Sequence, residues 1–363
     1  MENKNQNKRP TLRELFFELE RQKAGRYDIV VPSKELKVVY DVGTNKISMD
    51  VPQPEAAPKN HGITNYAHHQ LADKCGIPWR YYDKMQTEGQ LPLLANNVNT
   101  WLPNKEKRLV RVLDNNVRAV LSDKYRCIDN YDILLQTLNQ FKELQEKNHL
   151  TIDVKQNQLT DSHLYIKATS PDLVGEVFHL ENRAPEPVHG GIIISNSEVG
   201  AGSFKVEPFI NVLVCQNGLI REKVFKRVHI GREHSLGYVN WSNKTLELQD
   251  AALWAKIGDM ITQTFTPELF QKWINEINQI AQTDIPKPTL AIDNIIKHFK
   301  LPENKKNALI DQFTRESPTQ WGLSMAVTRV AQDEDDYEKQ IELEKIGAKI
   351  LNKEITPLVV KSG

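Results

Sequence analysis

The sequence predicts an α+β protein, in which a central antiparallel β-sheet with hairpin–helix units is followed by an all-helical C-terminal part. Two patterns predict this class. Between about residues 108 and 228, short apolar or alternating segments are separated by Gly, Asn and Asp, as in strands and hairpins. From residue 246 onward, apolar residues recur at helical spacing instead. The 363 residues, 39% hydrophobic and 26% charged, have the composition of a globular protein.

The N-terminal part divides into two predicted units. Residues 1–10 are polar and predict a disordered tail. Residues 11–59 predict a helix with one apolar face, then short strands, then a linker in which prolines interrupt any regular element. These prolines are Pro52, Pro54 and Pro58.

Residues 60–245 are predicted to form the α+β core domain. Thr64 can cap a first helix, and Asp129 or Asn130 can cap a longer one that ends near Lys147. The first two predicted strands form a β-hairpin around Asp114-Asn115-Asn116, and more strands follow. The predicted strands are 108–113, 117–123, 150–154, 163–168, 176–181, 191–194, 209–215 and 224–228.

Residues 246–363 form the predicted helical C-terminal region. Its last two helices carry enough apolar residues to favour a helical lid over the core. The alternative is that they form a contact between the subunits of a homo-oligomer. The predicted helices are 246–264, 267–282, 289–299, 303–316, 319–332 and 334–351.

A polar loop, SNSEVGAGS, lies between two predicted buried strands, 192–194 and 209–215. A loop held between packed strands presents its side chains in a fixed arrangement. Its glycines allow backbone conformations closed to other residues, or a close approach by a ligand. We therefore predict that the loop shapes a groove or a subunit contact. The residues concerned are Ser195, Asn196, Ser197, Glu198, Gly200 and Gly202.

Two basic segments are the predicted nucleic-acid-binding residues. Cations beside an aromatic ring suit a phosphate backbone with a base stacked on the ring. The first segment comprises Arg108, Arg111, Arg118, Lys124 and Arg126, with Tyr125 as the stacking residue. The second comprises Lys223, Lys226 and Arg227. On a strand, the side chains of Lys223 and Lys226 point to opposite faces, which weakens the second patch. We predict that both segments join into one trough; the alternative is a solvated, charged face of the hairpin.

Acidic and histidine residues raise the alternative of a metal-dependent phosphodiester-acting enzyme. Its first candidates are His179, Glu181, Glu198 and Glu207. Their spacing matches no recognised zinc or two-metal motif, so scattered surface groups are the simpler interpretation. The serines lack the glycine–x–serine–x–glycine form of a nucleophile elbow. We therefore assign no catalytic residue, no metal ligand and no cofactor, and we favour a non-enzymatic role.

Charge and cysteine content limit the classes of function. Lys+Arg and Asp+Glu are both 47, so overall charge does not indicate nucleic acid. No apolar run reaches the roughly 18–20 residues of a membrane span. Cys75, Cys127 and Cys215 are odd in number and far apart, which suits a reducing compartment rather than a disulfide framework. We expect a cytoplasmic protein without a membrane partner.

Several strings resemble one family. They are NYAHHQLADKCGIPWRYYDKM, RLVRVLDNNVRAVLSDKYRCIDNYDIL, GGIIISNSEVGAGSFKVEPFINVLVCQNGLI and WGLSMAVTRVAQ. They look like the phage/plasmid-like proteins grouped under a numbered domain of unknown function, over about Asn60 to Leu351. This resemblance implies a gene of a phage, plasmid or integrative element and supplies no catalytic residues. More weakly, a basic hairpin, a long helix and further strands are similar to the single-strand annealing proteins of phage recombination, which form rings and hold single-stranded DNA in a basic groove.

The leading prediction is therefore a mobile-element protein that binds nucleic acid, with single-stranded DNA favoured, and that pairs or protects single strands. The second hypothesis is the metal-dependent phosphodiester-acting enzyme. The third is a protein-interaction module that acts against host factors or with them.

Overall fold

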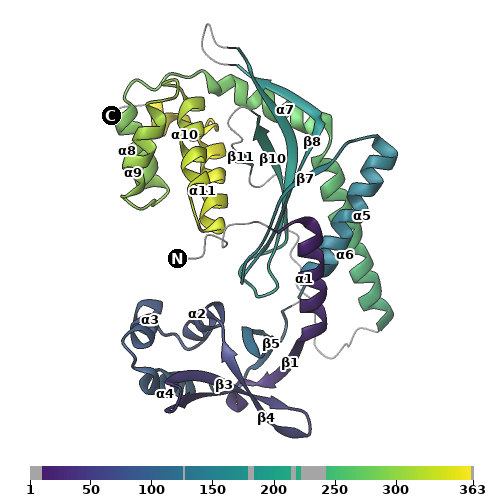
Figure 1. The fold of residues 1–363 in the computed structure, drawn as a ribbon, viewed down its shortest axis with the longest axis vertical. Coiled ribbons are helices and arrows are strands. Elements are labelled where there is room, and N and C mark those ends of the chain that lie inside the picture. The colour runs from purple at the N-terminus through teal and green to yellow at the C-terminus, as the bar shows by residue number, and fades with distance from the viewer. Residues whose placement is uncertain (1–9, 126, 179–183, 214–217, 222–242, 361–363) are drawn as a thin grey trace, which may run out of the picture.

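The computed structural model describes residues 10–125, 127–178, 184–213, 218–221 and 243–360. The chain forms two lobes, each built on its own β-sheet (Figure 1). The lower lobe in Figure 1 holds the first sheet, and the upper lobe holds the second sheet and most of the helices. The predicted α+β class and helical C-terminal part are confirmed. The predicted tail lies almost entirely outside the described residues.

The first lobe contains a six-stranded sheet with the strand order β1-β5-β6-β4-β3-β2. Its neighbouring strands are antiparallel except for β4 and β6, which run parallel where Gly62 faces Asn116. This sheet is therefore mixed, whereas the sequence predicted antiparallel pairing alone. The strands are β1 (Arg26–Pro32), β2 (Lys37–Asp41), β3 (Lys46–Gln53), β4 (Ala56–Ile63), β5 (Lys107–Leu113) and β6 (Asn116–Ser122).

Local turn chemistry explains two of these hairpins. Asp114 and Asn115, between β5 and β6, both have positive φ angles, 50° and 61°, as the tightest hairpin turns require. The hairpin predicted there is confirmed. The predicted proline linker is instead the β3–β4 hairpin, turned at Glu55 with a φ of 55°. Pro52 lies where the β3–β4 register shifts, a place where a missing N–H is tolerated.

Three helices cover one face of the first sheet. Their buried side chains, including Leu71, Tyr82 and Leu94, form one core with Val110 and Val120 of the sheet. The helices are α2 (Asn65–Lys74), α3 (Trp79–Thr87) and α4 (Leu91–Trp101), and a short 3₁₀ turn, η1 (Ser33–Glu35), joins β1 to β2.

The second lobe contains a five-stranded antiparallel sheet with the order β11-β10-β9-β8-β7, so each strand pairs with its neighbour along the chain. A register shift between Ser170 and Val174 bends the long β8–β9 hairpin. The strands are β7 (Asp153–Leu159), β8 (Leu164–Val177), β9 (Glu186–Asn196), β10 (Lys205–Val212) and β11 (Gly218–Ile220). The predicted strand 224–228 lies outside the described residues.

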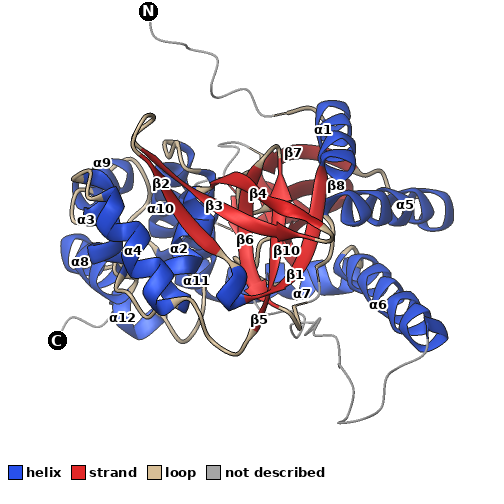
Figure 2. Ribbon diagram, turned by 90° about the horizontal axis from the view of Figure 1, so that it is seen from below, coloured by secondary structure: helices blue, strands red, loops and turns tan. Residues whose placement is uncertain are grey.

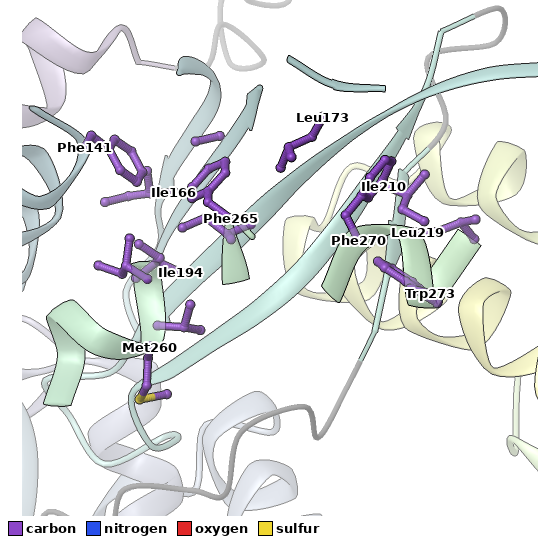
Figure 3. Close-up of a cluster of buried hydrophobic side chains, with 14 of the residues drawn as sticks. Phe141, Ile166, Leu173, Ile194, Ile210, Leu219, Met260, Phe265, Phe270 and Trp273 are labelled. Atoms are coloured by element: carbon purple, nitrogen blue, oxygen red, sulfur yellow. The ribbon is translucent and has the colours of Figure 1, made fainter. Parts of the chain in front are cut away.

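The second sheet lies between two layers of helices, as the views in Figures 1 and 2 agree. On one face, Ile166, Ile194 and Ile210 pack against Phe265 and Phe270, the main core shown in Figure 3. The helices of this layer are α1 (Leu12–Gly25), α5 (Asn130–Asn148), α6 (Asn243–Thr264) and α7 (Pro267–Ala281).

The opposite face of the second sheet is covered by α11 (Tyr337–Ile350), one helix of a C-terminal bundle. The bundle has a core of its own, which includes Ile295, Leu309, Val327 and Ile346. Its other helices are α8 (Pro288–His298), α9 (Lys305–Phe313), α10 (Gln320–Gln332) and α12 (Thr356–Val360).

The observed division of the chain differs from the predicted one. The first sheet runs across the predicted boundary at residues 59 and 60, because β1 to β6 pair with one another. Helix α1 belongs to the second lobe, where Leu15 and Leu19 enter the main core. The chain thus crosses between the lobes after α1 and again between β6 and α5.

Candidate functional site

The loop after β9 is fixed by its own hydrogen bonds. The hydroxyl oxygen of Ser197 accepts the N–H groups of Val199 and Ala201 at 3.4 and 2.9 Å. Gly200 has a φ of +81°, and a Cβ there would lie 2.7 Å from a methyl group of Leu121. Only glycine suits this position, because both the backbone conformation and the contact exclude a side chain. The prediction of a built loop with a required glycine therefore agrees with the geometry.

Asn196 and Glu198 join this loop to the start of α5. The Asn196 amide donates to the backbone oxygen of Ile128 at 2.9 Å and to Oδ1 of Asn130 at 2.8 Å. The backbone N–H of Asn130 donates to Oε1 of Glu198 at 2.6 Å. A carboxylate at this place satisfies an unpaired N–H and interacts favourably with the helix dipole. Glu198 thus caps α5 from 68 residues further along the chain.

Glu198 is also the centre of a buried ion-pair cluster. Its side chain is 4% exposed, and its two oxygens accept from Arg26 at 3.2 Å and from Arg118 at 3.1 Å. Arg111, also 4% exposed, donates to the backbone oxygen of Glu198 at 2.7 Å. Arg111 further pairs with Asp28 at 2.9 Å and with Asp129 at 3.2 Å, and Arg26 pairs with Asp129 as well.

The sheet geometry explains how two arginines from one hairpin meet at Glu198. β5 and β6 pair Arg111 with Ala119 and then Val112 with Val117. Arg118 is therefore the extra residue of a β-bulge, which turns its side chain to the face of Arg111. Asp28 lies directly opposite Arg111 on β1, where opposite charges pair favourably.

These contacts correct the prediction that the hairpin arginines bind phosphate. The guanidinium groups of Arg111 and Arg118 are buried and paired with carboxylates of the protein. Arg108 is 8% exposed and pairs with Glu106. Removing these groups from their partners would leave buried charges unpaired, so they are structural. Lys124 is exposed.

Tyr125 is half-buried, and its hydroxyl donates to the backbone oxygen of Ser197 at 3.3 Å. Burial raises the pKa of Tyr125 to about 12. Its ring packs against the buried cluster that contains Leu121 and Val199. The remaining predicted cations lie outside the described residues: Arg126, Lys223, Lys226 and Arg227.

The loop is a joint between the lobes and not the wall of a groove. Gln70 of α2 donates to the backbone oxygen of Val199 at 2.7 Å and accepts the N–H of Val120 at 2.8 Å. Val199 packs with Leu109 and Leu121 of the first sheet. The predicted groove residues Ser195, Asn196, Ser197 and Glu198 are all buried. Gly202 is not in the left-handed region, and a Cβ there would meet Nε2 of His163 at 2.9 Å.

The two metal candidates that the structure describes, Glu198 and Glu207, are not brought together. Glu198 and Glu207 each belong to a different ion-pair cluster, and Glu207 accepts from Lys345 at 2.8 Å. His179 and Glu181 lie outside the described residues. Within the described part of the chain, no group of three or more His, Cys, Asp and Glu side chains is arranged to hold a metal ion.

A groove of about 1040 Å³ lies between α7, the end of α8 and the segment that joins α11 to α12. Its apolar wall includes Trp273 and Phe299. Four cations line it, together with two carboxylates and one imidazole. These charged and titratable residues are Arg221, Lys272, Lys349, Lys353, Glu276, Glu354 and His298. We call this feature the basic groove.

Contacts within the basic groove leave part of its positive charge free. Arg221 pairs with Glu276 at 2.6 Å and lies over the Trp273 ring, 5.7 Å from its centroid. Lys349 lies 5.8 Å from the centroid of Phe299. Lys272 and Lys353 are exposed, and neither makes an ion pair within the part of the chain that the structure describes. The groove thus combines positive charge with aromatic rings, the chemistry that the sequence predicted for the hairpin.

Sequence reasoning missed the basic groove because its residues come from segments far apart in the chain. Lys272 is on α7, whereas Lys349 and Lys353, four residues apart, lie at the end of α11 and just after it, so only this pair is local in the sequence. Arg221 lies two residues before Lys223, the first residue of the second basic segment.

Comparisons of the chain with protein-family models, with curated proteins and with solved structures found no match. The resemblance to phage/plasmid-like proteins therefore stays a prediction. Among the described residues, no helix combines the length and apolarity needed to cross a membrane.

Proposed function

We propose that the protein binds single-stranded nucleic acid in the basic groove. The observation that carries this proposal is the charge balance of the groove, where four cations face two carboxylates beside Trp273 and Phe299. Phosphate groups favour clustered lysines and arginines, and bases stack on aromatic rings or on a guanidinium plane. We retain the nucleic-acid-binding function predicted from the sequence, and we propose the basic groove as its site instead of the β5–β6 hairpin.

The distribution of charge in the groove suits a polymeric ligand. The volume of about 1040 Å³ lies at the upper end of typical ligand sites, about 1,000 Å³. Free positive charge on both walls, at Lys272 and Lys353, suits a backbone that carries a phosphate on every nucleotide. The resemblance to phage/plasmid-like proteins supports a role in a mobile element, in which the protein pairs or protects single strands as a homo-oligomer.

The test is a triple variant, Lys272→Ala, Lys349→Ala and Lys353→Ala, titrated with a fluorescein-labelled oligo-dT by anisotropy. Each phosphate neutralised contributes about −0.7 to the slope of log K against log salt for a single strand. Loss of three contacts should flatten the slope by about 2. The fold loss of affinity at about 50 mM salt should therefore be about 20 times the fold loss at about 200 mM salt.

The matched control removes the same charge from other exposed sites: Lys84→Ala, Lys142→Ala and Lys147→Ala. The side chains of these lysines are 63%, 73% and 71% exposed, and among the described residues they pair only along their own helices. The control should keep the parent slope. Equal slopes for parent and groove variant, or equal losses for groove and control variants, would show that the groove is not the binding site.

A further inference from the structure

The face of the second sheet beneath α11 is chemically unlike a hydrophobic core. It presents His163 just before β8, Tyr165 and Lys167 on β8, Ile193 on β9, and Glu207 and Phe209 on β10. We call these residues the covered face. Lys167 is 2% exposed, although lysine is among the residues least often found fully buried.

An aromatic ring of the covered face lies beside its buried lysine. Nζ of Lys167 lies 5.1 Å from the centroid of the Phe209 ring. The rings of His163 and Tyr165 are stacked, with centroids 5.5 Å apart. Sheet faces that read single-stranded nucleic acid carry aromatic rings on adjacent strands, with cations nearby for the phosphates. The covered face has both components.

Helix α11 occupies the covered face with groups that imitate such a ligand. Oε2 of Glu344 lies 2.5 Å from Nζ of Lys167, and Oε1 of Glu338 lies 2.9 Å from Nδ1 of His163. The ring of Tyr337 packs edge-on against Tyr165, with centroids 5.2 Å apart. Carboxylates thus lie against Lys167 and His163, where phosphates would bind, and the Tyr337 ring lies beside Tyr165, where a base would bind. One pair has the opposite sense, because Lys345 of α11 donates to Glu207 of β10 at 2.8 Å.

Energetic considerations suggest that this contact is replaceable. A buried ion pair such as Lys167–Glu344 contributes little more than well-packed apolar residues would, because both charges are desolvated. The buried apolar cluster under α11 is small, and apart from the covered face it adds Ile220, Tyr337 and Ile341. The other side of α11, with Leu343 and Ile346, belongs to the core of the C-terminal bundle. Helix α10 of that bundle is anchored in the main core by Trp321 and Met325, so displacement of α11 from the sheet has to leave this anchor in place.

The covered face also adjoins the basic groove. Ile220 packs with Phe209 of the covered face and also lines the basic groove. Ala348 and Lys349, at the end of α11, line the basic groove as well. A strand bound in the groove would therefore meet the end of α11 first. We infer that the covered face is a second single-strand-binding surface, and that α11 is an internal competitor displaced when nucleic acid extends from the groove. This inference rests on the proposed function.

The test compares two single substitutions on α11. Glu338→Lys removes the carboxylate from His163 and should weaken the docking of α11, while Glu342→Lys makes the same charge change at an exposed position of the same helix. Glu338→Lys should bind oligo-dT about 5- to 10-fold more tightly than Glu342→Lys, as expected for moderately coupled equilibria. Equal affinities would overturn the inference.

A second variant removes the cation and keeps the packing. In Lys167→Met/Glu344→Met both charges are replaced together, which avoids an unpaired buried charge. Combined with Glu338→Lys, it should abolish the gain in affinity. A third variant, Thr160→Cys/Glu338→Cys in a Cys215→Ser background, allows a short bis-maleimide to hold α11 on the sheet, since these side chains are 3.1 Å apart. The cross-linked protein should bind less tightly than the same protein before cross-linking.

Hydrogen exchange separates the two proposals. Oligo-dT should accelerate amide exchange in residues 337–350 if α11 is displaced. Binding that depends on the groove lysines but leaves this exchange and the cross-linked affinity unchanged would overturn the inference and keep the proposed function. If Glu338→Lys binds oligo-dT equally well with and without the groove lysines, the covered face would be supported as a binding surface and the groove would be refuted as one. Absence of binding by the parent and every variant would refute both.

Discussion

Replacement of Glu198 should destabilise the protein more than any ordinary surface change, because this one carboxylate joins both lobes to α5. The perturbations are Glu198→Ala, which removes the acceptor, and Glu198→Gln, which keeps an acceptor of similar shape but removes the charge. Glu198 accepts from Arg118 and Arg26 and from the N–H of Asn130. The other contacts of each partner show which lost interaction should lower the free energy of unfolding the most.

In Glu198→Ala, Arg118 loses the only carboxylate it contacts among the described residues, while its side chain stays 13% exposed. Arg26 keeps Asp129 as a partner, so its loss is partial. Removal of one partner of a buried ion pair typically costs about 3–5 kcal/mol. Loss of the acceptor for the Asn130 N–H adds less than its separate cost, because losses at one site are not additive, so the total stays within that range. Glu198→Gln should cost about 1.5–3 kcal/mol, the value of hydrogen bonds to a charged group.

The assay is urea unfolding followed by tryptophan fluorescence, with the midpoint and slope fitted for each variant. Glu143→Ala is the matched control, because Glu143 pairs with Lys147 on an exposed face of α5. The control should lose less than about 0.5 kcal/mol. A loss below about 1 kcal/mol for Glu198→Ala would refute the reasoning that this cluster holds the lobes together.

Three further outcomes are expected. Burial lowers the pKa of His68 from 6.5 to about 4, so the unfolded chain binds more protons than the folded chain between these two pH values. The free energy of unfolding should therefore fall by up to about 3 kcal/mol as the pH drops from 6.5 to about 4. A His68→Gln variant titrated alongside should lack most of this dependence. Burial raises the pKa of Cys75 to about 11 and of Cys127 to about 12, so a Cys215→Ser variant should show almost no reaction with a thiol-specific disulfide reagent at about pH 8 until it is unfolded, and rapid labelling of the native protein would contradict this. Gly191→Ala should cost about 3 kcal/mol or more by thermal unfolding, because its Cβ would lie 2.1 Å from the backbone oxygen of Ala168, whereas Gly25→Ala meets only ordinary contacts at 3.7 Å and should be nearly neutral.

Local patterns in the sequence were sufficient for much of the secondary structure. Alternation of apolar and polar residues around Asp114-Asn115-Asn116 predicted the β5–β6 hairpin, because the turn needs residues that tolerate positive φ. Helical periodicity predicted the C-terminal helices, and prolines marked several of their boundaries. Spacing between apolar residues is a property of neighbours in the chain, so the sequence alone contains it.

Long-range pairing was not predicted. The parallel contact of β4 with β6 and the docking of α1 on the second lobe depend on which surfaces bury each other. Those choices involve residues far apart in the chain, and no local period reports them. The predicted linker became a hairpin for the same reason, because the N–H that Pro52 lacks is tolerated where the β3–β4 register shifts.

The sequence by itself determined that this chain is an α+β protein with a rigid loop at Ser195–Gly202 and with cations concentrated in a hairpin. Only the tertiary structure decided which cations face solvent. It buried Arg111 and Arg118 against Glu198 and left Lys272 and Lys353 beside a groove. The physical reason is that an arginine paired with a carboxylate of the protein is not available to a ligand. The carboxylate that pairs with Arg118 lies 80 residues away in the chain, so no local pattern in the sequence reports it.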